Sequence, residues 1–288
     1  MRILIPGGDG MLGHELLRVL GLAHEVRVTL RRELPAYEKA KLFHSGNSYF
    51  GVDVRDLQRL QMAFEDFRPQ AVINAVGVVK QRPDASDAIS SITINSLFPH
   101  QLAGMCARFD ARVIHMSTDC VFSGDRGGYK EGDITDARDM YGKSKILGEL
   151  QGNNSVTLRT SIIGRELSRK TGLLEWFLAQ QGPVKGYRKA VFSGFSTTEM
   201  ARIIDRLLAR YPKASGLYHV SSEPIAKYDL LAMIKRQFGL RTKILSDESV
   251  HIDRSLDSSR FRADLAYTPP TWTEMIRELA DDNPLVTK

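Results

Sequence analysis

The chain opens with Ile3-Leu4-Ile5-Pro6-Gly7-Gly8-Asp9-Gly10-Met11-Leu12-Gly13, an apolar strand that runs straight into closely spaced glycines and then into a helical pattern. Glycine permits a tight turn and a close approach of the backbone to a phosphate, and a helix N-terminus adds free N–H groups. A glycine-rich turn can also be purely structural. Between a first strand and an immediate helix, however, the pattern predicts a dinucleotide site at Gly7, Gly10, Met11, Leu12 and Gly13.

Short β-branched runs alternate with longer amphipathic stretches over the first half of the chain. The expected strands are Arg2–Ile5, Glu25–Leu30, Ala71–Val76, Arg112–Met116 and Ser155–Arg159. The expected helices are Met11–Leu20, Asp56–Phe67, Ile92–Phe109 and Met140–Leu150. This alternation predicts an α/β fold, a Rossmann-type doubly wound parallel sheet with helices on both faces.

The pattern changes after about Gly164, where helical stretches dominate. They are Leu173–Gln181, Thr197–Tyr211 and Lys227–Phe238, with one good strand at Leu217–Val220 among them. We therefore expect a dinucleotide-binding domain over residues 1–163 and a smaller, helix-rich substrate-binding lobe over residues 164–288. The boundary is approximate, and the two regions can exchange strands.

The composition excludes several classes of protein. Of 288 residues, 42% are hydrophobic and 26% charged, which excludes a mostly disordered chain. The net charge of +6 suits an anionic ligand but does not argue for nucleic acid. Two cysteines and seven histidines without ligand spacing predict no metal site and no disulfide framework. No signal peptide or membrane-length apolar run is present, so we expect a cytoplasmic protein that does not bind membranes.

The end of the second expected strand bears on the choice of cofactor. An NAD site usually has an acid there to hold the ribose 2′-hydroxyl, but this strand ends in Arg31 and Arg32. Two guanidiniums suit a 2′-phosphate, so NADP(H) is favoured and NAD(H) stays open. The alternative is a solvated loop with incidental arginines. Further along, Asp53 and Val54 can meet the adenine edge, and a third segment can run beside the cofactor backbone: Asn74, Ala75, Val76 and Gly77.

Tyr141 and Lys145 are spaced so that a helix would carry both side chains on one face. A nearby ammonium favours the phenolate, so we expect Lys145 to lower the pKa of Tyr141 and make it a better proton donor and acceptor. Thr118 follows a strand end, from which its hydroxyl can reach the crevice beyond the sheet. The spacing alone also occurs in ordinary amphipathic helices.

Taken together, these motifs resemble the extended short-chain dehydrogenases/reductases, and most of all the dTDP-4-dehydrorhamnose reductase group. The resemblance spans nearly the whole chain. It rests on five segments: Ser117–Gly124, Tyr129–Asp133, Tyr141–Glu149, Leu158–Ser161 with Gly164, and Asp253–Ser258.

By motif position, the resemblance implies that Thr118, Tyr141 and Lys145 are catalytic. Tyr141, Lys145, Ser117 and Asn95 would also contact the cofactor, and Asn95 resembles the helix asparagine that supports a proton relay. Asp119, Cys120, Trp176 and Arg254 would contact the substrate, although an aromatic residue on an apolar helix face, such as Trp176, is more often core, and Cys120 is favoured as a small buried hydrophobe. Cys120 stands where the family usually has tyrosine, and the proline usual before Arg254-Ser255 is missing.

The resemblance implies an NADPH-dependent reductase of a nucleotide-linked 4-keto-6-deoxy sugar. Two alternatives stay open. One is a nucleotide-sugar epimerase that retains NAD, and the other is an NADP-binding regulatory subunit without catalysis, as in the β subunit of methionine adenosyltransferase. The departures from the family pattern leave the identity of the sugar undetermined. The sequence also does not decide whether the chain forms a homodimer.

Overall fold

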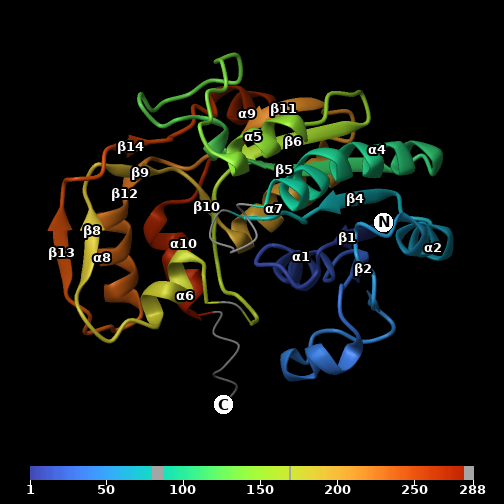
Figure 1. Cartoon of the computed structure of the whole chain (residues 1–288), viewed down its shortest axis with the longest axis horizontal. Helices are drawn as coiled ribbons and strands as arrows, with labels where there is room; N and C mark the ends of the chain where they lie inside the picture. Colours follow the sequence, from blue (N-terminus) through green and yellow to red (C-terminus); the bar gives the residue numbers. More distant parts are fainter. Residues whose placement is uncertain (80–86, 169, 282–288) are drawn as a thin grey trace.

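A seven-stranded parallel sheet forms the centre of the molecule (Figure 1). The structure is a computed structural model that describes residues 1–79, 87–168 and 170–281. The strand order is β11-β6-β5-β4-β1-β2-β3. The strands span Arg2–Pro6 (β1), Glu25–Thr29 (β2), Ser48–Tyr49 (β3), Ala71–Asn74 (β4), Arg112–Thr118 (β5), Ser155–Thr160 (β6) and Gly216–His219 (β11).

The pleat of the central strands explains why both faces are covered. Ile3 and Ile5 of β1 pack into one apolar core together with α1 (Gly13–Leu20) and α7 (Thr197–Arg210). Leu4, between them, packs into a second core with α2 (Leu57–Phe67) and α4 (Phe98–Arg108). Neighbouring side chains of a strand point to opposite faces. The predicted doubly wound sheet is therefore confirmed.

The remaining elements of the sheet lobe are helical. They are α3 (Ala88–Ser91), the π-helix η3 (Ile92–Leu97), α5 (Met140–Leu147), α9 (Ser259–Asp264) and the 3₁₀ turns η1 (Leu34–Ala40) and η4 (Asp119–Val121). The predicted helix over residues 92–109 is thus a π-helix that continues into α4.

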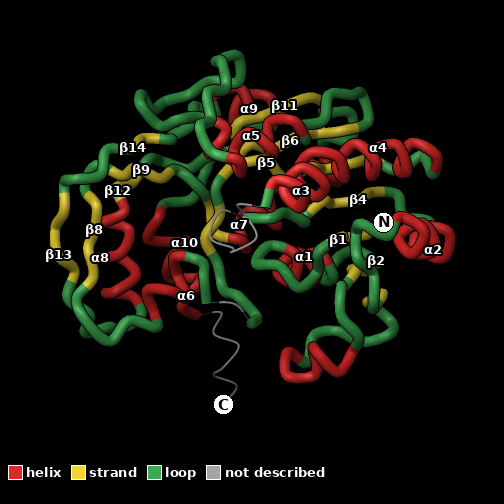
Figure 2. The backbone as a smooth tube through the Cα atoms, viewed as in Figure 1, coloured by secondary structure: helices red, strands yellow, loops and turns green. Residues whose placement is uncertain are grey.

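The smaller lobe contains more strand than the sequence predicted (Figure 2). Its helices are α6 (Leu173–Leu178), α8 (Lys227–Gln237) and α10 (Trp272–Asp281). Short strands form three small sheets: β8 (Val184–Tyr187) with β13 (Ile244–Asp247), β9 (Ala190–Phe192) with β12 (Ile225–Ala226) and β14 (Ile252–Asp253), and β7 (Ile162–Ile163) with β10 (Phe195–Ser196). Most have only two to four residues, too few to give a clear alternating pattern.

The chain crosses between the lobes more than once. After β10 it returns as α7, which packs against α1, and then as β11, which pairs with β6 at the edge of the main sheet. Although both follow residue 163, β11 is a strand of the main sheet and α7 packs against its helix α1. The domain boundary at residue 163 stays a prediction. No helix in the described part of the chain is long and apolar enough to cross a membrane.

Candidate active site

A cleft of about 140 Å³ opens where β1, β2 and β4 end. Parallel strands gather their carboxyl ends at one edge, which is where doubly wound sheets bind ligands. Eight of the residues predicted to bind a cofactor line the cleft: Gly7, Gly10, Arg31, Asp53, Val54, Ala75, Val76 and Gly77. Asp9, Thr29 and Arg55 also line it and were not predicted.

The glycine-rich loop is packed too tightly for side chains at two of its positions. Gly7 has φ +86°, and a Cβ on Gly13 would lie 2.1 Å from the Gly7 carbonyl oxygen. The loop therefore presents backbone to the cleft, as a phosphate-binding turn does. Beside it the Thr29 hydroxyl is buried without a hydrogen-bond partner among the described residues. A buried polar atom of this kind needs a partner, and a polar ligand in the cleft would supply one.

Nine of the predicted cofactor residues are not among those that line the cleft: Met11, Leu12, Gly13, Arg32, Asn74, Asn95, Ser117, Tyr141 and Lys145. Met11 and Leu12 lead into α1, and the Leu12 side chain belongs to the apolar core. The Arg32 backbone N–H donates to the Tyr37 hydroxyl at 3.2 Å. Asn74 lies behind the cleft, where its Oδ1 accepts from Val76 N–H at 3.2 Å and orders the loop after β4.

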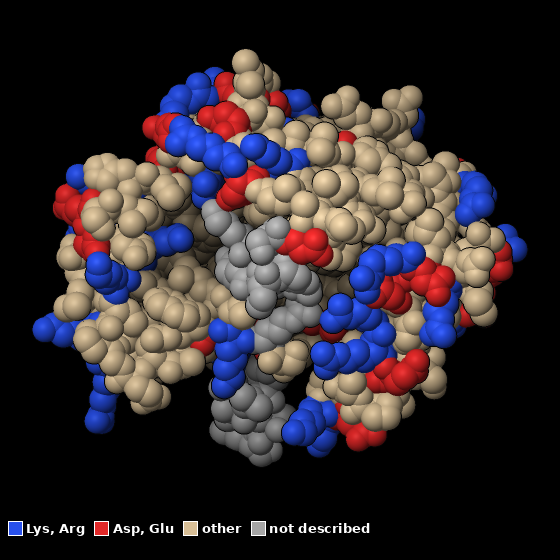
Figure 3. All heavy atoms as spheres, viewed as in Figure 1, with Lys and Arg blue, Asp and Glu red and all other residues tan. Residues whose placement is uncertain are grey.

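At the β2 end of the cleft, acidic and basic side chains meet. Arg55 holds the Asp53 carboxylate with two side-chain bonds, Nε–Oδ1 at 2.9 Å and Nη2–Oδ2 at 2.6 Å. The hydrogen bonds from Arg55 lower the pKa of Asp53, and the charge of Arg31 adds to this. Lys and Arg side chains lie among acidic ones over this part of the surface in Figure 3.

The three predicted catalytic residues come together beside the end of β5. Thr118 ends the strand, and its hydroxyl accepts from Cys120 N–H at 3.1 Å. Tyr141 and Lys145 lie on α5, whose first turn is capped by Asp139. The Tyr141 phenol lies beside Thr118, and the Lys145 ammonium donates to the Met116 carbonyl at 2.6 Å. The site thus joins a phenol, a hydroxyl and an ammonium, the groups needed for proton transfer to a carbonyl oxygen.

The charge state of this group differs from the sequence-based expectation. We expected Lys145 to lower the pKa of Tyr141, but burial raises that pKa, and the neighbouring Cys120 and Asp119 raise it further. Burial also lowers the pKa of Lys145 to about 8, against the opposing charge of Glu149. Desolvation disfavours the charged form of either group. Tyr141 is therefore a protonated phenol at neutral pH, ready to donate.

Asn95 connects the cofactor loop to the catalytic helix. Its side chain lies in the π-helix and is fully buried. Oδ1 accepts from Val78 N–H at 2.9 Å, and Nδ2 donates to the Val78 carbonyl and to Ser144 Oγ. Asn95 thus fixes the loop after β4 against α5, so that the cleft and the catalytic residues keep their relative positions.

A buried ion pair supports the catalytic helix from behind, and the sequence did not predict it. Glu149 binds Arg159 through two contacts of 2.7 Å and accepts from Ser117 Oγ, also at 2.7 Å. Arg159 also contacts His219 Nε2 at 3.2 Å. Arg159, whose charge alone makes it a plausible phosphate partner, is therefore a structural residue. Lys80 and Arg82, plausible phosphate partners by the same reasoning, lie outside the described residues.

The predicted substrate residues fall into two groups. Asp119, Cys120 and Arg254 lie together, with Arg254 Nε donating to the Phe122 carbonyl at 2.8 Å. Burial raises the pKa of Asp119 while Arg254 opposes it, and burial raises the pKa of Cys120 to about 12, so this thiol stays protonated. Trp176 lies on α6 in the smaller lobe, where it is 38% exposed.

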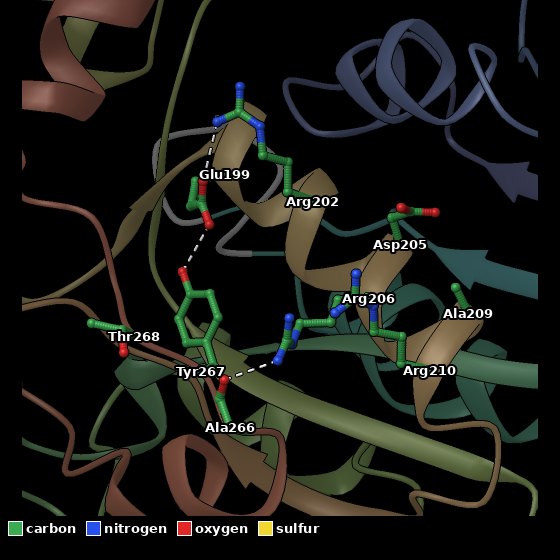
Figure 4. A pocket seen from close by; sticks show the side chains of 9 residues that line it. All are labelled: Glu199, Arg202, Asp205, Arg206, Ala209, Arg210, Ala266, Tyr267 and Thr268. Atoms are coloured by element: carbon green, nitrogen blue, oxygen red, sulfur yellow. Dashed lines mark hydrogen bonds and ion pairs between the residues drawn. The ribbon is translucent and has the colours of Figure 1, made fainter.

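A second cavity, of about 440 Å³, lies between α7 and residues 266–268 (Figure 4). Arg202 is paired there with Glu199 and Glu278, and Arg206 donates to the carbonyls of Leu265 and Ala266. It contains none of the predicted site residues. Among the described residues, no cluster of His, Cys, Asp and Glu is arranged to hold a metal ion.

Comparison with known proteins gives a consistent result. The family described as RmlD substrate binding domain matches residues 1–283. A dTDP-4-dehydrorhamnose reductase of Burkholderia thailandensis is 30% identical over 77% of this chain and 73% of its own. Methionine adenosyltransferase 2 subunit beta of Bos taurus is 25% identical over 83% of this chain and 72% of its own. The crystal structure of a hypothetical dTDP-4-dehydrorhamnose reductase from Sulfolobus tokodaii superposes with a TM-score of 0.75, at 29% identity over 94% of this chain and 98% of its own.

Proposed function

The chain belongs to the RmlD substrate binding domain family and is an oxidoreductase of the extended short-chain dehydrogenase/reductase type, and we propose that it reduces a nucleotide-linked 4-keto-6-deoxy sugar with NADPH. One observation carries the proposal. Thr118, Tyr141 and Lys145 meet beside the end of β5, next to a glycine-walled cleft at the same edge of the sheet. A carbonyl group bound between the cleft and these three residues would have a proton donor on one side and a cofactor on the other.

The cleft fits a dinucleotide in two respects. The loop at Gly7 and Gly10 offers backbone close to a pyrophosphate, and the unpartnered Thr29 hydroxyl can bond to a ribose or phosphate oxygen. When bound, the nicotinamide ring supplies the hydride. NADP(H) is favoured over NAD(H), because Arg31 follows the end of β2, where an NAD site usually has an acid.

The residues of the chain then have distinct roles. Tyr141 donates its phenolic proton to the oxygen of the sugar carbonyl, since burial keeps it protonated. The Thr118 hydroxyl, which donates to Asp119 Oδ1 in the free protein, would turn to donate a second hydrogen bond to the same oxygen. The Lys145 ammonium stabilises the phenolate left behind, and Asn95 keeps α5 in position.

Asp119, Cys120 and Arg254 provide the substrate side, with Trp176 closing from the smaller lobe. The Arg254 guanidinium would contact the diphosphate with the N–H groups that Phe122 does not use. The protonated Cys120 thiol adds a small apolar contact. The cytoplasmic location stays a prediction.

The test is to offer the purified protein NADPH and a panel of nucleotide-linked keto sugars, and to follow the absorbance of the reduced nicotinamide. Net oxidation of NADPH that Tyr141→Phe abolishes supports the proposal. Interconversion of sugars without net loss of cofactor would identify an epimerase instead. Tight NADPH binding without turnover on any sugar would favour a cofactor-binding subunit, the alternative suggested by the similarity to methionine adenosyltransferase 2 subunit beta.

A further inference from the structure

The segment that follows β2 carries both arginines predicted to bind a 2′-phosphate, and one side chain anchors it. Every residue from 31 to 39 is exposed except Tyr37, which is 9% exposed and belongs to the apolar core. The Tyr37 ring lies edge-on to Phe43, with the ring centroids 5.4 Å apart, and packs near Phe50 at 6.4 Å. The position of this segment therefore depends on Tyr37.

The Tyr37 hydroxyl makes two hydrogen bonds, one to each of two loops. It accepts from Arg32 N–H at 3.2 Å and donates to Asp9 Oδ2, also at 3.2 Å. Asp9 belongs to the glycine-rich loop and lines the cleft. Burial raises the pKa of Tyr37, and the charge of Asp9 raises it too, so the hydroxyl keeps the proton that it donates. One phenol thus joins the loop after β2 to the glycine-rich loop.

The bond to Arg32 bears on Arg31, the guanidinium that lines the cleft. On one side of Arg31, the residue Leu30 is buried and bonded through both its N–H and its carbonyl. On the other side, Tyr37 holds the Arg32 N–H, and the Arg32 carbonyl accepts from Gly51 N–H at 3.2 Å. Tyr37 is the one side chain among these anchors, so a substitution can remove its bond and leave the backbone bonds in place.

A phosphorylated dinucleotide would contact both loops at once. Its pyrophosphate lies against the glycine-rich turn, and its ribose 2′-position lies near the end of the second strand. A guanidinium binds a phosphate most strongly in a fixed bidentate geometry, and a loop that is ordered before binding loses less entropy when the ligand arrives. NADH spans the same two loops but has no 2′-phosphate, so it gains little from a fixed position of Arg31.

We propose that the Tyr37 hydroxyl is a positioning group for the 2′-phosphate of NADP(H), because it ties the loop of Arg31 to the glycine-rich loop at Asp9. Tyr37 does not line the cleft, and it acts through Arg31. The inference rests on the proposed function only in taking the ligand of the cleft to be a nicotinamide dinucleotide whose 2′-phosphate binds Arg31. The reaction and the sugar play no part in it.

The test is Tyr37→Phe, which removes the hydroxyl and keeps the buried ring. The dissociation constants of NADPH and NADH are measured by fluorescence titration of the substrate-free protein. The NADPH constant should rise roughly 10-fold, the upper end of what a lost hydrogen bond costs, and the NADH constant should change by less than about 2-fold. A hydroxyl with a purely structural role would lower the melting temperature or weaken both cofactors alike.

A double-mutant cycle with Arg31→Ala shows whether Tyr37 acts through Arg31. Arg31→Ala alone should weaken the binding of NADPH more than that of NADH, because it removes the charge that pairs with the 2′-phosphate. In the Arg31→Ala background, Tyr37→Phe should change the NADPH constant by less than about 2-fold, because the group that it positions is gone.

Tyr49→Phe is the matched control, because it removes a hydroxyl from a nearby tyrosine that does not line the cleft. The Tyr49 hydroxyl bonds to Arg27 and Asp66, away from the glycine-rich loop. Tyr49→Phe should leave both dissociation constants unchanged. Melting temperatures of all variants identify any loss of folding.

Equal weakening of NADPH and NADH by Tyr37→Phe, or no effect on either, would overturn the inference. So would a loss in Tyr37→Phe that is as large with Arg31→Ala as without it, since Tyr37 would then act independently of Arg31. An Arg31→Ala variant that binds NADPH as tightly as the wild type would overturn the inference together with the preference for NADP(H). A wild type that binds neither cofactor would overturn the proposed function as well, whereas normal binding without sugar reduction would count against the proposed reaction alone.

Discussion

Replacing Lys145 by Met should stabilise the ligand-free protein at neutral pH while it removes activity. Lys145 is 4% exposed, and burial lowers the pKa of Lys145 from 10.5 to about 8. At about 1.4 kcal/mol per pKa unit, this difference makes the charged form about 3 kcal/mol less favourable in the folded chain than in water. Met removes the charge and keeps much of the volume. It also removes the bond to the Met116 carbonyl, which offsets about 1–2 kcal/mol of the gain.

The pH dependence gives the sharper measurement. Between pH 8 and 10.5 the unfolded chain still holds the Lys145 proton, whereas the folded chain has lost it. The unfolded state therefore binds more protons, and the free energy of unfolding rises with pH across this window. The wild type should gain about 3 kcal/mol from this residue between pH 7 and pH 10.5, and Lys145→Met should lack that gain.

Urea unfolding at several pH values, followed by circular dichroism without cofactor, measures the difference between the two proteins. Lys143→Met is the control, because Lys143 is exposed on the same helix, and it should follow the wild type. A difference between wild type and Lys145→Met that stays constant from neutral to alkaline pH would refute the reasoning. Lys145→Met should also bind NADPH more weakly than the wild type, because we expect Lys145 to contact the cofactor.

Three further predictions concern the site and its support. Tyr141→Phe should lower turnover by about 100-fold or more with NADPH binding intact, because proton transfer acts only in the transition state; near-normal turnover would remove Tyr141 from the mechanism. Glu149→Gln should cost about 3–5 kcal/mol in urea unfolding by leaving the buried Arg159 unpaired, and an unchanged midpoint would contradict this. Gly13→Ala should lower the melting temperature and abolish cofactor binding, since its Cβ would meet the Gly7 carbonyl at 2.1 Å; normal NADPH affinity would show that the loop can yield.

The sequence predicted the main sheet because its strands are buried on both faces and its helices are amphipathic. The strand expected at 71–76 has every residue of its observed core, 71–74, buried. The π-helix at Asn95 could not be predicted, because one extra residue per turn leaves no clear signature in the apolar spacing. The small strands of the second lobe are likewise too short for a pattern.

Within the site, the glycine loop and the catalytic residues could be predicted, because each is recognised by the spacing of its residues along the sequence. The ion pair between Asp53 and Arg55 could not be predicted, because a two-residue separation in a loop gives no direction to either side chain. Glu149, just after α5, pairs with Arg159 of β6. The pair could not be predicted, because only the fold brings these two side chains together and buries them. The raised pKa of Tyr141 follows from the same cause, since burial is a property of the fold and not of a motif.

The return of the chain to the main sheet makes the two lobes one folding unit. A fragment ending at residue 163 would lose β11, and with it the partner that covers the outer edge of β6. All six residues of β6 are buried in the full chain, so the fragment would expose an unpaired strand edge of the kind that aggregates. It would also lose α7, which packs against α1 just behind the glycine loop. The smaller lobe therefore cannot be removed or exchanged as a separate module, because α7 and β11, which belong with the main sheet, lie between its elements in the chain.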